Sequence, residues 1–237
     1  MITKVIAESQ ISGIHRITDL FENGEFPSAK VLAQIPIYEL VKLSMHKRFQ
    51  LWTKESLDDF FKILLPVMHK LIKKHKKAPI IIEVAAATAD LSHGLRKYFP
   101  GFEFIPIDKD VDQKYLNRGL RLGYIEDFVF ANIRKNLGIA EQNPIIVIGS
   151  NLFLGNGQER LLLQQNVCDE VLLVQSLTPQ NHILLSGDSY LGEVVQFWEQ
   201  KISLTSSNRW FTSILTKEKF SDEPSLAINK IYHYSRR

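Results

Sequence analysis

The chain has 237 residues, of which 45% are hydrophobic and 23% are charged, as in a soluble globular protein. The formal net charge of +3 is too small to demand a nucleic-acid partner. Cys168 is the only cysteine, which excludes an internal disulfide and a zinc site built from several cysteines.

The amino terminus does not resemble a signal peptide. Met1-Ile2-Thr3-Lys4-Val5 lacks the long apolar core of a signal peptide. No apolar run approaches the ~20 residues that cross a membrane. A single cysteine also fits a reducing compartment. We therefore expect a cytoplasmic protein with no membrane segment.

The first 77 residues predict a helical segment. The pattern turns helical near residues 28–35, and residues 38–49 and 56–75 read as two further helices. Apolar residues recur at three and four positions in the last of these, which is typical of an amphipathic helix. Pro66 interrupts that pattern and predicts a kink or a break.

A lysine-rich run closes this segment at residues 70–77. One interpretation is a basic patch for RNA or another polyanion. The favoured interpretation is the solvated end of a helix, where lysines complement the helix dipole. No aromatic residues alternate with the lysines, as they do on many nucleic-acid-binding surfaces. A nucleic-acid partner is therefore possible but unsupported.

The strongest pattern in the chain begins at Ile80. Ile80–Val84 is a nearly continuous run of β-branched residues, which predicts a strand buried on both faces of a parallel sheet. Apolar residues at helical spacing follow from Leu91 to Phe99. A strand, a tight turn and a helix form the first half of a βαβ unit. Glu83 lies near the carboxyl end of the strand, where open α/β sheets bind ligands.

Strands and helices then alternate as far as Ile202, and two strands follow. We expect strands at residues 102–107, 124–130, 145–148 and 171–174, a terminal antiparallel pair at 210–216 and 226–234, and helices at 111–122, 131–137, 158–166 and 190–202. This pattern predicts an α/β fold with a doubly wound, mostly parallel seven-stranded sheet. The sheet has an antiparallel C-terminal strand and is preceded by the helical N-terminal segment.

The central stretch resembles a known cofactor-binding motif. Glu83-x-Ala85-x-Ala87-x-Ala89-x-Leu91 is similar to the first motif of the class I S-adenosylmethionine (SAM) methyltransferases, Glu/Asp-x-Gly-x-Gly-x-Gly. The spacing is kept, and alanine replaces glycine at all three positions. The resemblance implies a methyltransferase-like Rossmann domain over residues 78–237 and SAM as the cofactor. It also implies that residues 1–77 form a helical segment or lid over the substrate side.

The resemblance also implies candidate cofactor residues at the ends of later strands. Asp108 ends the second strand about twenty residues past the turn, where an acid binds ribose hydroxyls. Asp127 is a candidate for contact with the adenine amino group, although a surface loop acid is an alternative. Ser150 and Asn151 follow the fourth strand, where the methyl acceptor would meet the cofactor, or they bond the backbone of a turn.

The implied cofactor site therefore consists of Glu83, Ala85, Ala87, Asp108, Asp127, Ser150 and Asn151, with no metal ligand and no identified catalytic residue. The methyl acceptor, small or macromolecular, and the oligomeric state are not predicted.

Two other chemistries compete with this interpretation. Gly187-Asp188-Ser189 resembles the nucleophile block of the SGNH hydrolases, but it comes late in the chain and no Asp-x-x-His follows it. A nicotinamide cofactor needs close approach of its pyrophosphate to the backbone, which three alanine methyl groups obstruct. SAM has no phosphate, so the alanines harm its binding less.

The alanines leave two hypotheses open. At a position that requires positive φ, alanine costs about 1 kcal/mol, and its methyl group can also enter the cofactor space. The first hypothesis is a SAM-dependent methyltransferase of unknown substrate. The second is a catalytically inactive methyltransferase-like fold that serves as a binding or scaffolding module.

Overall fold

The structure is a computed structural model, and it describes residues 15–32, 34–35, 52–124, 133–150, 167–175, 198–204 and 230–236. Its strands are β1 (Ile80–Val84), β2 (Glu103–Asp108), β3 (Arg121–Leu122), β4 (Ile145–Ser150), β5 (Glu170–Gln175), β6 (Trp198–Leu204) and β7 (Lys230–Arg236). Its helices are α2 (Ala29–Leu32), α4 (Lys54–His75), α5 (Asp90–Tyr98) and α7 (Ile133–Leu137), with a 3-10 helix η1 (Gln113–Arg118). Residues 15–22 are also helical.

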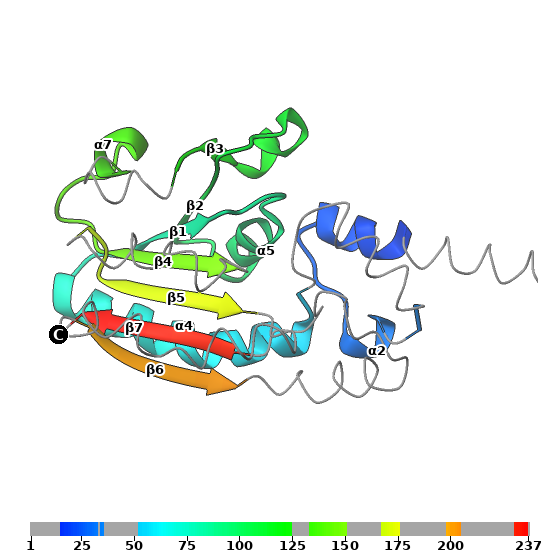
Figure 1. Ribbon diagram of the computed structural model, residues 1–237, viewed down its shortest axis with the longest axis horizontal. Coiled ribbons are helices and arrows are strands. Elements are labelled where there is room, and N and C mark those ends of the chain that lie inside the picture. Colours follow the sequence, from blue (N-terminus) through cyan, green and yellow to red (C-terminus); the bar gives the residue numbers. More distant parts are fainter. Residues whose placement is uncertain are drawn as a thin grey trace, which may run out of the picture.

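The strands form one sheet in the order β3-β2-β1-β4-β5-β7-β6. Figure 1 shows this order from β3 at the top to β6 at the bottom. β1 lies between β2 and β4 and pairs with both in parallel. β7 runs antiparallel to both β5 and β6, whereas the other pairs are parallel. The predicted α/β class, the mostly parallel sheet and the antiparallel C-terminal strand are confirmed.

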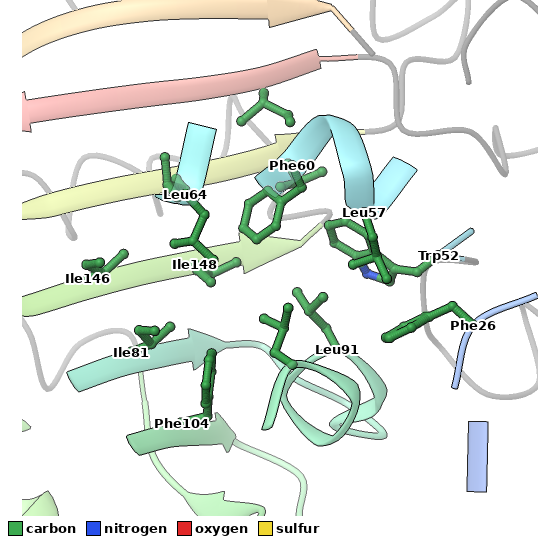
Figure 2. Packing of buried hydrophobic residues seen from close by; sticks show 14 of the residues in the cluster. Phe26, Trp52, Leu57, Phe60, Leu64, Ile81, Leu91, Phe104, Ile146 and Ile148 are labelled. Carbon is green, nitrogen blue, oxygen red and sulfur yellow. The ribbon is translucent and has the colours of Figure 1, made fainter. Parts of the chain in front are cut away.

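Helices cover both faces of the sheet. Successive strand residues point to opposite faces, so β1 sends Ile81 to one core and Ile80 and Ile82 to the other. The first core lies between the sheet and α4 and α5; in Figure 2, Phe60 and Leu64 of α4 point toward β4. The second core contains Ile133 of α7. This burial on both faces explains the run of isoleucines in the sequence.

The N-terminal residues contribute to the first core. Ile17, Phe21 and Phe26 are fully or almost fully buried, in the same cluster as Leu91 and Leu95 of α5. The helix α4 begins with a capping box between Thr53 and Ser56, which satisfies free backbone donors at its start. The described part of the N-terminal segment therefore packs directly against α5.

Pro66 neither breaks nor ends α4, which runs continuously from Lys54 to His75. Pro66 and Lys62, whose carbonyl loses its usual donor, lie on the exposed face of the helix. Water can therefore take the place of the missing amide. The prediction of a break was wrong.

The lysine-rich run contains the carboxyl end of α4. Lys76 caps the helix with a left-handed backbone at φ 56°. Lys70 Nζ lies 2.8 Å from the buried carboxylate of Glu170, at the start of β5. This ion pair fastens α4 to the sheet and gives one lysine of the run a structural role.

Three predicted elements differ from the structure. Residues 198–202 are part of β6 rather than a helix, because pairing with β7 outweighs the helical spacing of apolar residues. The helix predicted at 111–122 is the shorter η1, which Gly119 ends at φ +76°. The third strand pairs with β2 at Arg121–Leu122, ahead of the predicted range.

Other predictions lie outside the described residues: the helices at 38–49 and 158–166, most of the strand at 124–130, and the strand at 210–216. Among the helices that the structure describes, none is both long and apolar enough to cross a bilayer.

Candidate functional site

The candidate site lies at the carboxyl ends of β1, β2 and β4. Val84 is paired with Ile107 on one side and with Gly149 on the other. The next residues along the three strands are therefore Ala85, Asp108 and Ser150, at one edge of the sheet. In an open parallel sheet this is the edge at which ligands bind.

The turn between β1 and α5 has the backbone of a glycine-rich turn. Ala85, Ala87 and Ala89 have φ values of 53°, 47° and 55°. Among the described residues, Lys76 is the only other non-glycine residue with positive φ. L-residues avoid this region because Cβ crowds the following carbonyl, whereas glycine enters it freely. The alanines thus adopt the conformation that glycine is normally selected to provide.

Hydrogen bonds inside the turn fix this conformation. Ala86 N donates to Ile107 O of β2 at 3.0 Å, which ties the turn to the neighbouring strand. Ala89 N donates to Ala86 O at 2.6 Å and closes the turn. The carbonyl of Ala89 then accepts from His93 N at 2.9 Å, as the first bond of α5. The turn is therefore integrated with both the sheet and the helix.

Asp108 faces this turn. Its Oδ2 atom accepts a hydrogen bond from Ala87 N at 2.8 Å, and its Oδ1 atom accepts from Asp110 N at 2.9 Å. An ionised carboxylate has about four acceptor positions, so about two remain for a ligand. Asp108 is half-buried and Ala85 is exposed, so both can be reached from solvent.

Glu83 has a different environment. Its side chain is buried, and its Oε2 atom accepts from Ser92 N of α5 at 3.0 Å. Burial raises the pKa of Glu83 to about 7, although the hydrogen bonds from Ser92 oppose this shift. The carboxylate thus joins the strand before the turn to the helix after it. In this position it supports the turn rather than facing solvent.

A buried ionic network behind the turn was not predicted from the sequence. Arg118 is 2% exposed, and its Nη1 atom donates to Thr88 O at 3.0 Å and to Asp90 Oδ1. Thr88 Oγ1 in turn donates to Asp90 Oδ2 at 2.5 Å. Arg118 Nη2 lies 2.6 Å from Glu22 Oε2 in the N-terminal segment, an ion pair that lacks the alignment of a hydrogen bond. Two polar residues, Thr88 and Asp90, within an otherwise apolar motif were the available signal.

The acceptor side of the site is only partly described. Ser150 ends β4 next to β1, as expected, but the placement of its side chain is not described. Asn151, Asp127 and the Gly187-Asp188-Ser189 block lie outside the described residues. Their roles stay predictions. The described residues contain no group of three or more His, Cys, Asp or Glu arranged to bind a metal ion.

A search of family models finds no match for this chain, and a search of curated proteins finds none either. A search of solved structures returns SAM-dependent methyltransferases. One is the plantazolicin methyltransferase BamL, solved with S-adenosylhomocysteine (SAH) and a triazolic desmethylPZN analogue. It is 10% identical to this chain, covers 100% of this chain and 99% of its own, and has a TM-score of 0.46.

Two further matches come from a cyanobacterium and an archaeon. A SAM-dependent methyltransferase from Anabaena variabilis is 12% identical over 84% of this chain and 93% of its own, with a TM-score of 0.46. One from Archaeoglobus fulgidus is 10% identical over 74% of this chain and 94% of its own, with a TM-score of 0.38. Such low global similarity does not define an activity.

The strand order and the turn both agree with what the sequence motif implied. The sheet has the central β1 and the antiparallel C-terminal strand that the motif implied. The three motif positions have glycine-like φ values, and the acid after β2 contacts the turn. In these features the chain resembles the class I SAM-dependent methyltransferases.

Proposed function

We propose that the chain binds SAM at the turn after β1 and is a SAM-dependent methyltransferase of unspecified acceptor. The observation that carries the proposal is the positive φ of Ala85, Ala87 and Ala89. The alanines change the side chains of the motif and leave its backbone path intact. A chain that had merely lost its cofactor site would have no need of three strained residues at the motif spacing.

The residues present fit this cofactor. Asp108 is fixed by two backbone amides and keeps about two acceptor positions, the number that two ribose hydroxyls require. The Ala85 methyl group lies at the exposed side of the turn. A ligand without phosphate does not need the close backbone approach that this methyl group hinders. We place Glu83 as a support of the turn, and Asp127, Ser150 and Asn151 as further parts of the site.

The chemistry asks little of the protein beyond binding and alignment. SAM supplies a methyl group activated by its sulfonium. A nucleophilic acceptor aligned with that methyl group gains ~7 kcal/mol or more from proximity and orientation alone. The chain therefore needs to hold both molecules at the edge formed by β1 and β4. We further propose that residues 1–77 cover the substrate side of the domain formed by residues 78–237, and that the protein is cytoplasmic.

A second candidate function is a scaffold that does not bind SAM. The methyl group of Ala85 favours it, because Ala85 is an exposed residue of the turn and glycine there would have no side chain at all. The two candidates differ in one measurable property, the affinity for the cofactor.

The test is a calorimetric titration with SAH of the natural protein and two matched variants. Asp108→Asn keeps the shape of the side chain but removes its charge and half of its acceptor capacity. We expect it to weaken SAH binding about tenfold, the effect of losing one charged hydrogen bond. Asp110→Asn makes the same change at an exposed neighbour and should leave the affinity within about twofold. A folded natural protein that binds no SAH would support the scaffold instead.

A further inference from the structure

Arg118 connects the candidate cofactor turn to the N-terminal segment. Its guanidinium is buried between three elements: the turn through Thr88, α5 through Asp90, and the N-terminal segment through Glu22. The ring of Tyr115 lies 4.9 Å from the guanidinium carbon. A buried cation of this kind is stable only when its partners are in place, since an unpaired buried charge is strongly disfavoured.

The position of Thr88 explains what Arg118 does for the turn. Thr88 lies between Ala87 and Ala89, both of which have positive φ. Its carbonyl accepts from Arg118, and its hydroxyl donates to Asp90. Both polar groups of Thr88 are therefore fixed by the same ion pair. Alanine by itself prefers negative φ, so this fixation opposes relaxation of the turn.

We infer that Arg118 is a positioning residue for the alanine turn and that Glu22 of the N-terminal segment completes its effect. Glu22 is the only one of the two carboxylate partners that lies outside the α/β domain. It is 53% exposed, whereas Asp90 is 4% exposed. Docking of the N-terminal segment and the conformation of the turn are thereby coupled through one side chain.

A matched pair of variants tests this coupling. Glu22→Gln removes the charge that faces Arg118, and Glu25→Gln removes a similar charge in the same segment. Glu25 is 56% exposed and lies 3.8 Å from Lys97, on the outer side of α5, with no described contact to Arg118. The two substitutions therefore differ chiefly in the ion pair with Arg118.

The readout is residue-resolved amide hydrogen exchange of the ligand-free protein. For Glu22→Gln we expect exchange at the amides of Ala87 and Ala89 to increase about three- to fivefold, as for loss of a half-exposed ion pair. The amides of α7, which packs on the other face of the sheet, should change by less than about twofold, because they exchange by local opening that leaves this ion pair intact. For Glu25→Gln, all of these amides should stay within about twofold.

A larger effect is expected for Arg118→Lys. Lysine keeps the positive charge but lacks the planar fork that binds Thr88, Asp90 and Glu22 together. Exchange at the turn should increase more than about tenfold. If this variant does not fold, the Glu22 and Glu25 pair still decides. Equal turn exchange in Glu22→Gln and Glu25→Gln, or a parallel increase in α7, would overturn the inference.

The consequence for the ligand rests on the proposed function. If the turn binds SAM, Glu22→Gln should weaken SAH binding by the same three- to fivefold factor, about the value of one partly exposed ion pair. A natural protein that binds no SAH would refute the proposed function, while the exchange experiment would still test the positioning role. Raised turn exchange with unchanged SAH affinity would refute the coupling to the ligand.

Discussion

The alanines of the turn are a local strain that single substitutions can relieve. We expect Ala85→Gly, Ala87→Gly and Ala89→Gly each to raise the free energy of unfolding by about 0.5–1 kcal/mol. This is the cost of a left-handed L-residue less the backbone entropy of glycine. Urea denaturation of each variant measures the change.

Ala86→Gly is the control for these substitutions. Ala86 lies within the same turn and is buried, and its φ angle is not positive. Glycine there brings no relief of strain and adds entropy to the unfolded chain, so we expect a loss of about 1 kcal/mol. A uniform loss of stability at all four positions would contradict the left-handed assignment.

Glu83 predicts a specific dependence of stability on pH. Its folded-state pKa of about 7 exceeds the unfolded value of about 4.3, so the folded protein binds this proton more tightly. The resulting stabilisation is complete below the unfolded pKa and is lost as pH rises through about 7. Relative to Glu83→Gln, the natural protein should lose on the order of 3 kcal/mol between about pH 4.5 and pH 8.

Urea denaturation across this pH range measures the difference between the two proteins. Glu103→Gln, at an exposed position at the start of β2, is the control and should follow the natural protein at every pH. If the free energy of unfolding of Glu83→Gln changed with pH in the same way as that of the natural protein, the raised pKa of Glu83 would be refuted.

Individual residues of the candidate site could be predicted where their place depends on spacing along the chain. The position of Asp108 beside the turn followed from its place at the end of β2. Arg118 could not be found in this way, because its role depends on the path of η1 behind the turn. The left-handed alanines were foreseen only as a possibility, since the residue type gives no sign of the φ value.

Phe26 of the N-terminal segment packs against Gly94 of α5. A Cβ atom on Gly94 would lie 2.1 Å from Phe26 Cε2, so alanine cannot be accommodated unless Phe26 moves. We expect Gly94→Ala to lower stability by about 1–2 kcal/mol, because overpacking exceeds the gain in helix propensity. Gly101→Ala is the control, since its Cβ atom would meet nothing within 4 Å.

Thermal or urea denaturation of the two glycine variants checks this prediction. Exchange at the backbone of residues 15–28 should also increase in Gly94→Ala and stay unchanged in Gly101→Ala. Equal stability of the two variants would show that Phe26 does not occupy this place.

Elements were predictable where local pattern and long-range pairing agree. The predicted ranges of β1, β2, β5 and α5 match the structure within about two residues. The strands were predictable because both of their faces are apolar, and α5 because its apolar residues recur at helical spacing. β6 shows the opposite case. Its apolar residues have helical spacing, but the chain there pairs with β7 over seven positions. Local periodicity carries no information about that partner.

At the scale of the whole molecule, one core joins the N-terminal segment to the sheet. Ile17, Phe21 and Phe26 belong to the same hydrophobic cluster as the buried residues of α4 and β4. The candidate site lies beyond the carboxyl ends of the parallel strands, and Arg118 joins that edge to the segment. These contacts are the physical basis of the proposed coupling between the N-terminal segment and the turn.

We propose that the alanine turn is a working cofactor site. The most direct measurement is a calorimetric titration of SAH into the natural protein and into the triple variant A85G/A87G/A89G. Glycine adopts the left-handed backbone of these positions freely, so we predict that both bind and that their dissociation constants agree within about fivefold, or about 1 kcal/mol. If only the triple glycine variant binds, the alanine methyl groups close the site and the claim is refuted.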